Sequence, residues 1–97
     1  MTNPHDQPKP NHVLVAVITT SGTFPAQGFD EVPGNQPVKV ELARAARELH
    51  LTNTDGWVAT VAGRTLDVEK SYADNNLTGQ VEIQWGPPVG GGGGSQS

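Results

Sequence analysis

The sequence predicts a small α+β domain in which one helix lies across one face of a sheet of four to five strands. Three observations support this: a β-branched strand early in the chain, a single amphipathic helix in the middle, and a strictly alternating strand near the end. The chain has 97 residues, which is enough for one domain, and we expect its folded part to span residues 12–86. Residues 1–11 contain three prolines and should form a disordered arm.

The first expected strand covers residues 12–20 and is apolar on both faces. Val13, Val15 and Val17 alternate with a second apolar set, which consists of Leu14, Ala16 and Ile18. A strand of this kind is normally central in its sheet, or has its second face covered by something beyond its own core. A second strand within residues 23–32 is interrupted by Pro25 and Gly28, which indicates an edge position or a bulge.

The helix is expected to start at Pro37, which fits the first helical position because its missing N–H costs nothing there. Apolar residues then recur at helical spacing, while charged residues fill the remaining face. The apolar set is Val38, Leu42, Ala45, Ala46 and Leu49, and the charged set is Lys39, Glu41, Arg44, Arg47 and Glu48. The polar and glycine-containing residues 52–56 should end the helix.

Three further strands are expected, over residues 57–62, around residues 65–66 and over residues 80–85. A tight turn at Gly63-Arg64 joins the first two, and irregular chain with Tyr72 as its large anchor precedes the last. In the last strand Val81, Ile83 and Trp85 point to one face, and Glu82 and Gln84 point to the other.

Composition excludes several classes of function. The chain has no cysteine, which rules out disulfides and thiolate chemistry and fits a cytoplasmic protein. Its net charge is −4 and its basic residues are scattered, so we expect no nucleic-acid partner. The longest apolar run, Val13 to Ile18, is too short to cross a bilayer, and the start of the chain lacks the pattern of a signal peptide, so we expect no membrane association.

No arrangement of residues predicts a catalytic or metal site, and we expect no enzymatic activity, cofactor or metal. His5, His12 and His50 lie in unrelated segments without the spacing of metal ligands. No motif brings a serine against a base, and no lysine follows the glycines as a phosphate loop requires. The large aromatic residues Trp57, Tyr72 and Trp85 are better explained as packing residues than as a ligand cage.

Several motifs together resemble the ubiquitin-like β-grasp superfamily, and in particular bacterial ubiquitin-like modifier proteins. Residues 61–66 (VAGRTL) resemble the ubiquitin segment in which a strand ends in Ala-Gly and turns into a short strand with a buried leucine. Tyr72 resembles the tyrosine that fixes the loop before the last strand, and Val81 and Ile83 resemble the buried residues of that strand. Residues 35–37 (NQP), ahead of the helix, add to the likeness. The resemblance implies a mixed β-grasp sheet with one helix.

The tail over residues 87–97 carries five consecutive glycines, Gly90, Gly91, Gly92, Gly93 and Gly94, and should be flexible. By composition it suits either a tether, including an added linker, or a peptide that threads a narrow channel. The resemblance implies a conjugation tail: residues 95–97 are removed by a peptidase, a glycine carboxylate is adenylated, and partner enzymes transfer it to target proteins, with antiphage defence as the process. Which glycine is the mature end stays open.

The chain departs from ubiquitin at two positions that the resemblance covers. Its exit, Gly86-Pro87-Pro88-Val89, has no arginine, and Thr60 stands where ubiquitin has its central receptor-binding isoleucine. Two other functions also stay open. One is a β-grasp sulfur carrier that forms a C-terminal thiocarboxylate, and the other is a non-covalent, self-associating β-grasp interaction module.

The sheet face away from the helix is the second candidate site. One helix covers one face only, so the other face should present one parity of the strands as a docking surface for an enzyme, a receptor or another copy of the chain. The residues expected there are Leu14, Ala16, Ile18, Val58, Thr60 and Gln84.

Overall fold

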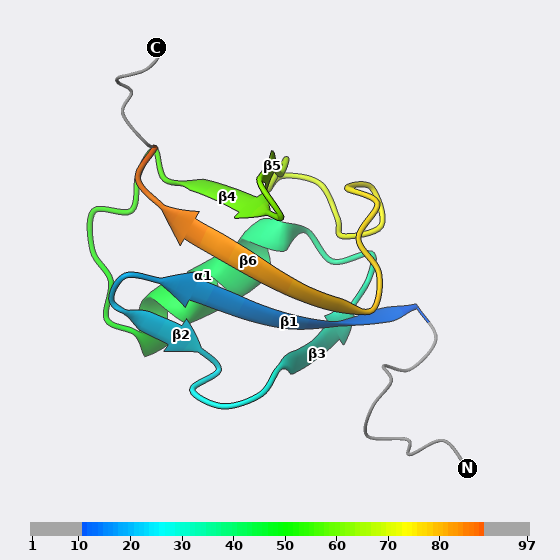
Figure 1. Ribbon diagram of the computed structural model, residues 1–97, viewed down its shortest axis with the longest axis horizontal. Helices are drawn as coiled ribbons and strands as arrows, with labels where there is room; N and C mark the ends of the chain where they lie inside the picture. Colours follow the sequence, from blue (N-terminus) through cyan, green and yellow to red (C-terminus); the bar gives the residue numbers. More distant parts are fainter. Residues whose placement is uncertain (1–10, 89–97) are drawn as a thin grey trace.

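The computed structural model describes residues 11–88, so the five tail glycines and most of the expected N-terminal arm lie outside the described residues. One helix, α1, and six strands form this part of the chain (Figure 1). Their bounds are β1 His12–Thr19, β2 Gly22–Phe24, β3 Asp30–Pro33, α1 Val38–Glu48, β4 Val58–Val61, β5 Arg64–Thr65 and β6 Gln80–Gly86.

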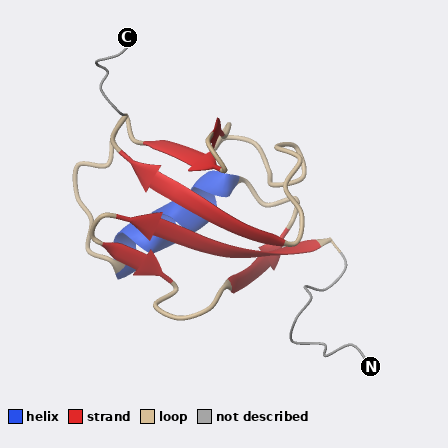
Figure 2. Ribbon diagram, viewed as in Figure 1, coloured by secondary structure: helices blue, strands red, loops and turns tan. Residues whose placement is uncertain are grey.

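The strands form one mixed sheet in the order β2-β1-β6-β4-β5, and β3 also pairs with β1 (Figure 2). The two central strands, β1 and β6, run parallel, with Leu14 opposite Gln80 and Ile18 opposite Gln84. The other pairings are antiparallel. The helix crosses one face of this sheet, as the sequence predicts, so the fold class is confirmed.

The expected second strand is divided into β2 and β3, which raises the number of strands to six. Both pair with β1, because Phe24 lies opposite Val17 and Asp30 lies opposite Val15. Residues 25–29 therefore make an excursion opposite a single residue of β1, Ala16. Pro25 cannot donate a ladder hydrogen bond and Gly28 has a φ of 73°, so the interruption lies where the sequence indicates it.

The start of α1 is capped by the backbone of a distant loop. Pro37 immediately precedes the first helical residue, Val38, and no side chain caps this end of the helix. Instead, the N–H groups of Val38 and Lys39 donate to the carbonyl oxygens of Lys70 (3.0 Å) and Val68 (2.9 Å). These contacts satisfy two amides that a helix start leaves without intrahelical partners.

The end of α1 is a Schellman motif with His50 in the left-handed region, at a φ of 57°. The Leu51 N–H donates to the Ala46 carbonyl at 2.8 Å, and the His50 N–H donates to the Arg47 carbonyl at 3.3 Å. His50 thus terminates the helix through its backbone.

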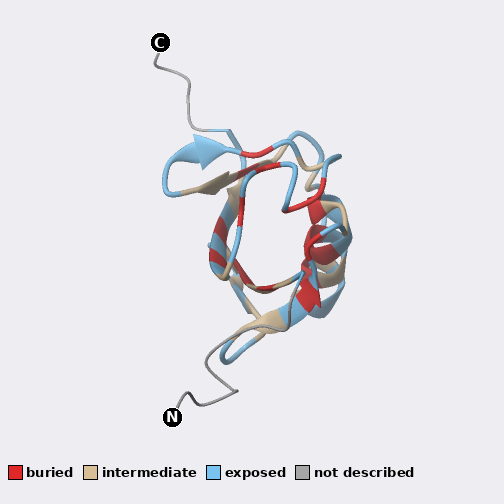
Figure 3. Cartoon of the chain, turned by 90° about the vertical axis from the view of Figure 1, so that its right-hand side faces the viewer, coloured by how far each residue is buried: buried red, intermediate tan, exposed pale blue. Residues whose placement is uncertain are grey.

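The core lies between α1 and the sheet, as Figure 3 shows in red. Val15, Val17 and Ile83 from the two central strands are fully buried there, together with Val38 from the helix. Tyr72 is also fully buried, which agrees with its expected role as the anchor of the irregular segment. Trp85 packs against this core with Val81 and Ile83, as the alternation of β6 predicts.

Asn75 holds the irregular segment together from the inside. Its side-chain oxygen accepts a hydrogen bond from the Asp67 N–H at 3.0 Å, and its amide nitrogen donates to the carbonyl oxygens of Asp67 (3.0 Å) and Ser71 (2.8 Å). The same segment provides the carbonyls that cap α1, so Asn75 connects the loop to the start of the helix.

One assignment on the helix is wrong. The sequence places Glu41 among the exposed charged residues, whereas its side chain is 0 % exposed. Neither carboxylate oxygen has a hydrogen-bond partner among the described residues. Arg44 lies nearby but donates its hydrogen bond to Asp30 of β3, at 2.9 Å. Burial raises the pKa of Glu41 to about 8; the neighbouring Asp30 carboxylate adds to the rise, and Arg44 opposes it.

Candidate partner-binding surface

The two faces of the sheet have different side chains because alternate residues of a strand point to opposite sides. Val15, Val81 and Ala59 face the helix and are buried. The strand registers align the alternate residues, whose side chains point away from the helix, into rows across the outer face of the sheet. The central row joins Ile18 of β1, Gln84 of β6 and Thr60 of β4.

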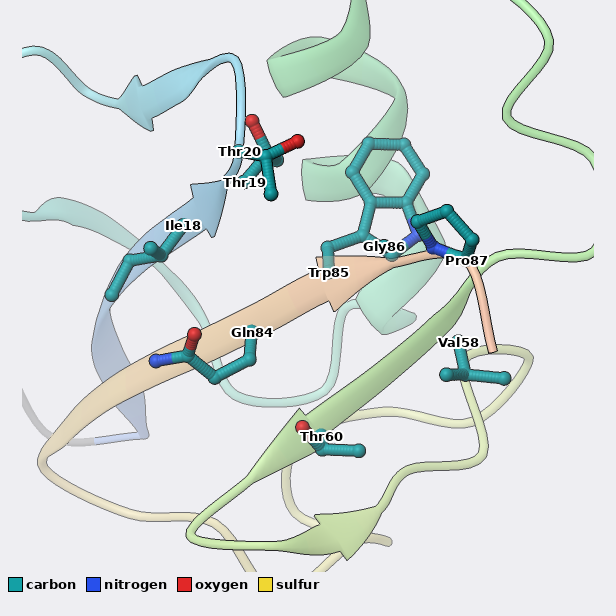
Figure 4. A pocket seen from close by; sticks show the side chains of 9 residues that line it. All are labelled: Ile18, Thr19, Thr20, Val58, Thr60, Gln84, Trp85, Gly86 and Pro87. Carbon is teal, nitrogen blue, oxygen red and sulfur yellow. The ribbon is translucent and has the colours of Figure 1, made fainter. Parts of the chain in front are cut away.

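A shallow hollow of about 420 Å³ lies on this outer face, beside the end of β6. We call it the exit hollow, because the chain leaves the sheet there through Gly86 and Pro87. Figure 4 shows Ile18, Gln84 and Thr60 on three neighbouring strands, with Val58 and Pro87 near the chain exit. Among the residues that the structure describes, those that line the hollow are all uncharged: Ile18, Thr19, Thr20, Val58, Thr60, Gln84, Trp85, Gly86 and Pro87.

Four of the six residues expected on the docking face meet in the exit hollow, namely Ile18, Val58, Thr60 and Gln84. The other two share the outer face but do not line the hollow. Leu14 lies near the opposite end of β6, opposite Gln80. Ala16 is only 5 % exposed and offers little surface to a partner. The role of these six residues in binding stays a prediction.

A second hollow, of about 410 Å³, adjoins the first along β6. We call it the Glu82 hollow. It shares Gln84 with the exit hollow, and its lining consists of Phe29, Val61, Ala62, Gly63, Gln80, Glu82 and Gln84. Sequence reasoning missed Phe29, because this residue belongs to the excursion between β2 and β3, where no strand period indicates a face. Its half-buried ring borders a hollow on the outer side of the sheet.

The charged strand residues on the outer face are acidic. By strand alternation, the described strands direct two carboxylates, Glu31 and Glu82, and one histidine, His12, to this side, and no lysine or arginine. Lys39, Arg44 and Arg47 lie on α1, on the opposite side of the sheet. The outer strand face therefore carries carboxylates without lysine or arginine, whereas α1 carries residues of both signs, with Glu41 and Glu48 beside its three basic residues.

The expected conjugation glycines, Gly90 to Gly94, lie outside the described residues. The structure does describe the residues that lead to them: Gly86 ends β6, and Pro87 lines the exit hollow and is exposed. The glycine run thus follows three residues, Pro87, Pro88 and Val89, after the last strand.

Between residues 11 and 88, no group of three or more His, Cys, Asp or Glu side chains could hold a metal ion. Within the same range, no helix is long and apolar enough to span a membrane. Two buried titratable side chains, Glu41 and Tyr72, lie under α1, with the partly exposed Asp30 and Arg44 beside Glu41. Burial raises the pKa of the Tyr72 hydroxyl above its ordinary value, and the Glu41 charge adds to this rise.

Comparison with known proteins gives matches at the level of structure. No protein-family model matches the chain, and no curated protein sequence does. A de novo designed protein based on ubiquitin matches with a TM-score of 0.64 and 16% identity, over 89% of this chain and 100% of that one. The N-terminal ubiquitin-like domain of the 4931431F19Rik protein matches with a TM-score of 0.59 and 16% identity, over 99% of this chain and 95% of that one.

A third structure, described by the words "molecular mimicry of SUMO promotes DNA repair", matches with a TM-score of 0.58 and 14% identity, over 77% of this chain and 92% of that one. At such identities the likeness concerns the fold alone. The mixed sheet, the single helix across it and these neighbours agree: the chain has the β-grasp fold of ubiquitin-like domains.

Proposed function

We propose that this chain is a ubiquitin-like protein modifier without enzymatic activity of its own. In this proposal a peptidase removes residues 95–97, an activating enzyme adenylates the exposed glycine carboxylate, and a conjugating enzyme transfers the acyl group to target proteins. The resemblance to bacterial modifiers extends the proposal to a cytoplasmic role in defence against phage.

The observation that supports it best is the position of the glycine run in the chain. Five glycines follow the final strand of a ubiquitin-like fold, after an exit that contains Pro87 and Pro88. Glycine has no Cβ, so a glycine tail can enter a narrow active-site channel and lets an acceptor approach its carbonyl closely. Consecutive prolines favour an extended conformation, which would direct the glycines away from the sheet.

Mass spectrometry of the full chain, expressed together with its neighbouring genes, tests the proposal. We expect target proteins with covalent adducts that end in one of the tail glycines. Replacing Gly90 to Gly94 with alanines keeps the tail length and should abolish the adducts, while replacing Ser95 with alanine should not. An intact Ser97 without any adduct would contradict the proposal. A terminal carboxylate with one oxygen exchanged for sulfur would indicate a sulfur carrier instead.

We further propose that the partner enzymes dock on the exit hollow. It adjoins the point where the tail leaves the sheet, so one enzyme could contact the hollow and the tail together. Thr60 lies at the β4 end of the row that crosses this hollow, and Thr60→Arg should reduce conjugation at least about tenfold by placing a large charged side chain in an otherwise uncharged contact. Thr78→Arg, at an exposed loop position outside the hollow, is the matched control and should leave conjugation unchanged.

A further inference from the structure

We infer that the Glu82 hollow is a recognition site for a basic side chain, a lysine ammonium or an arginine guanidinium, on an extended segment of a partner protein. The inference deepens the proposed docking on the outer face and names the chemistry of the partner there. It does not depend on the activation of the tail.

The Glu82 carboxylate is free to accept a cation. Its side chain is exposed on β6, and no described residue forms a hydrogen bond or an ion pair with it. Within residues 11–88, no other charged residue lines this hollow. An arriving lysine or arginine would therefore meet a carboxylate that no described cation already neutralises.

The other residues of the hollow suit the same ligand. The side-chain amides of Gln80 and Gln84 flank Glu82 on the same face of β6, and their oxygens can accept hydrogen bonds from an ammonium or a guanidinium. The half-buried ring of Phe29 borders the hollow from the other side of β1 and offers an aromatic surface to a cation. A carboxylate, two amides and an aromatic ring form a cation site with little attraction for an anion.

The spacing of the two hollows adds a sequence requirement on the partner. Glu82 and Gln84 are two residues apart on one strand, and the uncharged exit hollow begins at Gln84. Residues two apart in an extended chain point to the same side and lie about 7 Å apart. A strand-like segment along β6 would therefore insert an apolar side chain into the exit hollow and a basic side chain, two residues away, into the Glu82 hollow.

A second copy of the chain fits the site less well than such a segment. The helix face of another copy offers Lys39, Arg44 and Arg47, but Lys39 already pairs with Glu69 at 2.7 Å and Arg44 with Asp30 at 2.9 Å. A helix also does not present side chains at the two-residue spacing of the hollows. Self-association through this face is thus an outcome that the experiment can reveal.

The test uses the full chain labelled with ¹⁵N and short threonine-flanked peptides that contain Leu-Thr-Lys or Lys-Thr-Leu. The control peptides carry glutamine in place of lysine. We expect at least one lysine peptide to shift the amide signals of Gln80, Glu82 and Gln84, and to bind about fivefold tighter than its glutamine counterpart. Glu82→Gln should abolish this difference, and Phe29→Leu, which keeps an apolar side chain without the ring, should reduce it.

Glu31→Gln is the matched control, since Glu31 is the other carboxylate on this face and lies outside the hollow. It should leave the preference for lysine intact, and the amide spectrum of each variant shows whether it is folded. Equal binding of lysine and glutamine peptides would overturn the inference, and so would the absence of any shift at millimolar peptide. An unchanged preference for lysine in Glu82→Gln would overturn it as well. Shifts confined to the helix face, or shifts that appear on raising the protein concentration without peptide, would also contradict it. Failure of the tail to form adducts would leave this result unaffected, so the two proposals fail separately.

Discussion

The Oε1 atom of Glu41 lies 3.7 Å from Nη1 of Arg44, whereas the same guanidinium nitrogen lies 2.9 Å from Oδ2 of Asp30. Arg44 therefore gives its closer contact to Asp30, and the buried Glu41 keeps a carboxyl group without a hydrogen bond from a described residue. A charge in that position would be poorly solvated, which favours the protonated form at neutral pH.

We expect the stability of the domain to fall as the pH rises from about 5 to about 8. The pKa of Glu41 is raised from its ordinary value of 4.5 to about 8, so the folded state holds a proton in this range that the unfolded state has lost. Below the unfolded pKa this group makes no difference, and above pH 8 its full penalty is present, at most a few kcal/mol. Urea unfolding at pH 6, 7, 8 and 9 measures the trend.

The matched variant is Glu41→Gln, which keeps the shape of the side chain but cannot ionise. It should flatten the trend and should be the more stable protein at pH 9. An equal pH trend in both proteins would show that Glu41 is not the group responsible.

Asn75→Ala should destabilise the domain by about 1–2 kcal/mol, because the part-buried Asp67 N–H and the buried Ser71 carbonyl each lose a side-chain partner. Hydrogen exchange should also become faster at the amides of Val38 and Lys39, which the same loop caps. Asp74→Ala, at the exposed neighbouring position, serves as control and should change stability by less than about 0.5 kcal/mol. Unchanged exchange at the helix start would show that the cap does not depend on Asn75.

Ala62→Gly should stabilise the β4–β5 hairpin. The two turn residues, Ala62 and Gly63, have φ values of 51° and 83°, as a type I′ turn requires, and alanine is strained in this region by about 1–2 kcal/mol. We expect a net gain of up to about 1 kcal/mol in the free energy of unfolding. Ala73→Gly, at an exposed position without a positive φ, should instead destabilise the protein; if both variants lost stability equally, the turn would carry no strain.

Trp57 and Trp85 should be energetically coupled. Their ring centroids lie 5.1 Å apart with an interplanar angle of 76°, an edge-to-face arrangement that contributes about 0.5–1.5 kcal/mol beyond the area that the rings bury. The double-mutant cycle of Trp57→Leu and Trp85→Leu, followed by chemical unfolding, measures this coupling. Additive effects of the two substitutions would show that the rings only fill space.

The central architecture could be predicted because it depends on periodicity. The alternation of Val81, Ile83 and Trp85 and the helical spacing of Val38, Leu42 and Ala45 record directly which side of each element is buried. The hairpin at residues 61–66 and the buried Tyr72 resemble the corresponding features of ubiquitin closely enough to be recognised.

Other features depend on contacts between distant segments, which a local pattern does not record. Glu41 has the sequence neighbourhood of an exposed helix residue, and only the packing of α1 against the sheet and the loop buries it. The excursion over residues 25–29 has no period, so Phe29 gave no signal of its position beside Glu82. Four of the expected docking residues share one hollow. They meet there because of the registers between strands, and the sequence of a single strand does not specify these registers.

The parallel pairing of β1 with β6 has a practical consequence for work with this protein. Both strands run in the same direction, so the described chain enters the sheet at one end and leaves it at the other (Figure 1). A fluorescent domain or an affinity tag fused ahead of Asn11 would sit remote from Pro88 and leave the exit unobstructed. If several copies were fused in series, successive domains would be joined at opposite ends of their sheets, and the outer face of each would stay accessible.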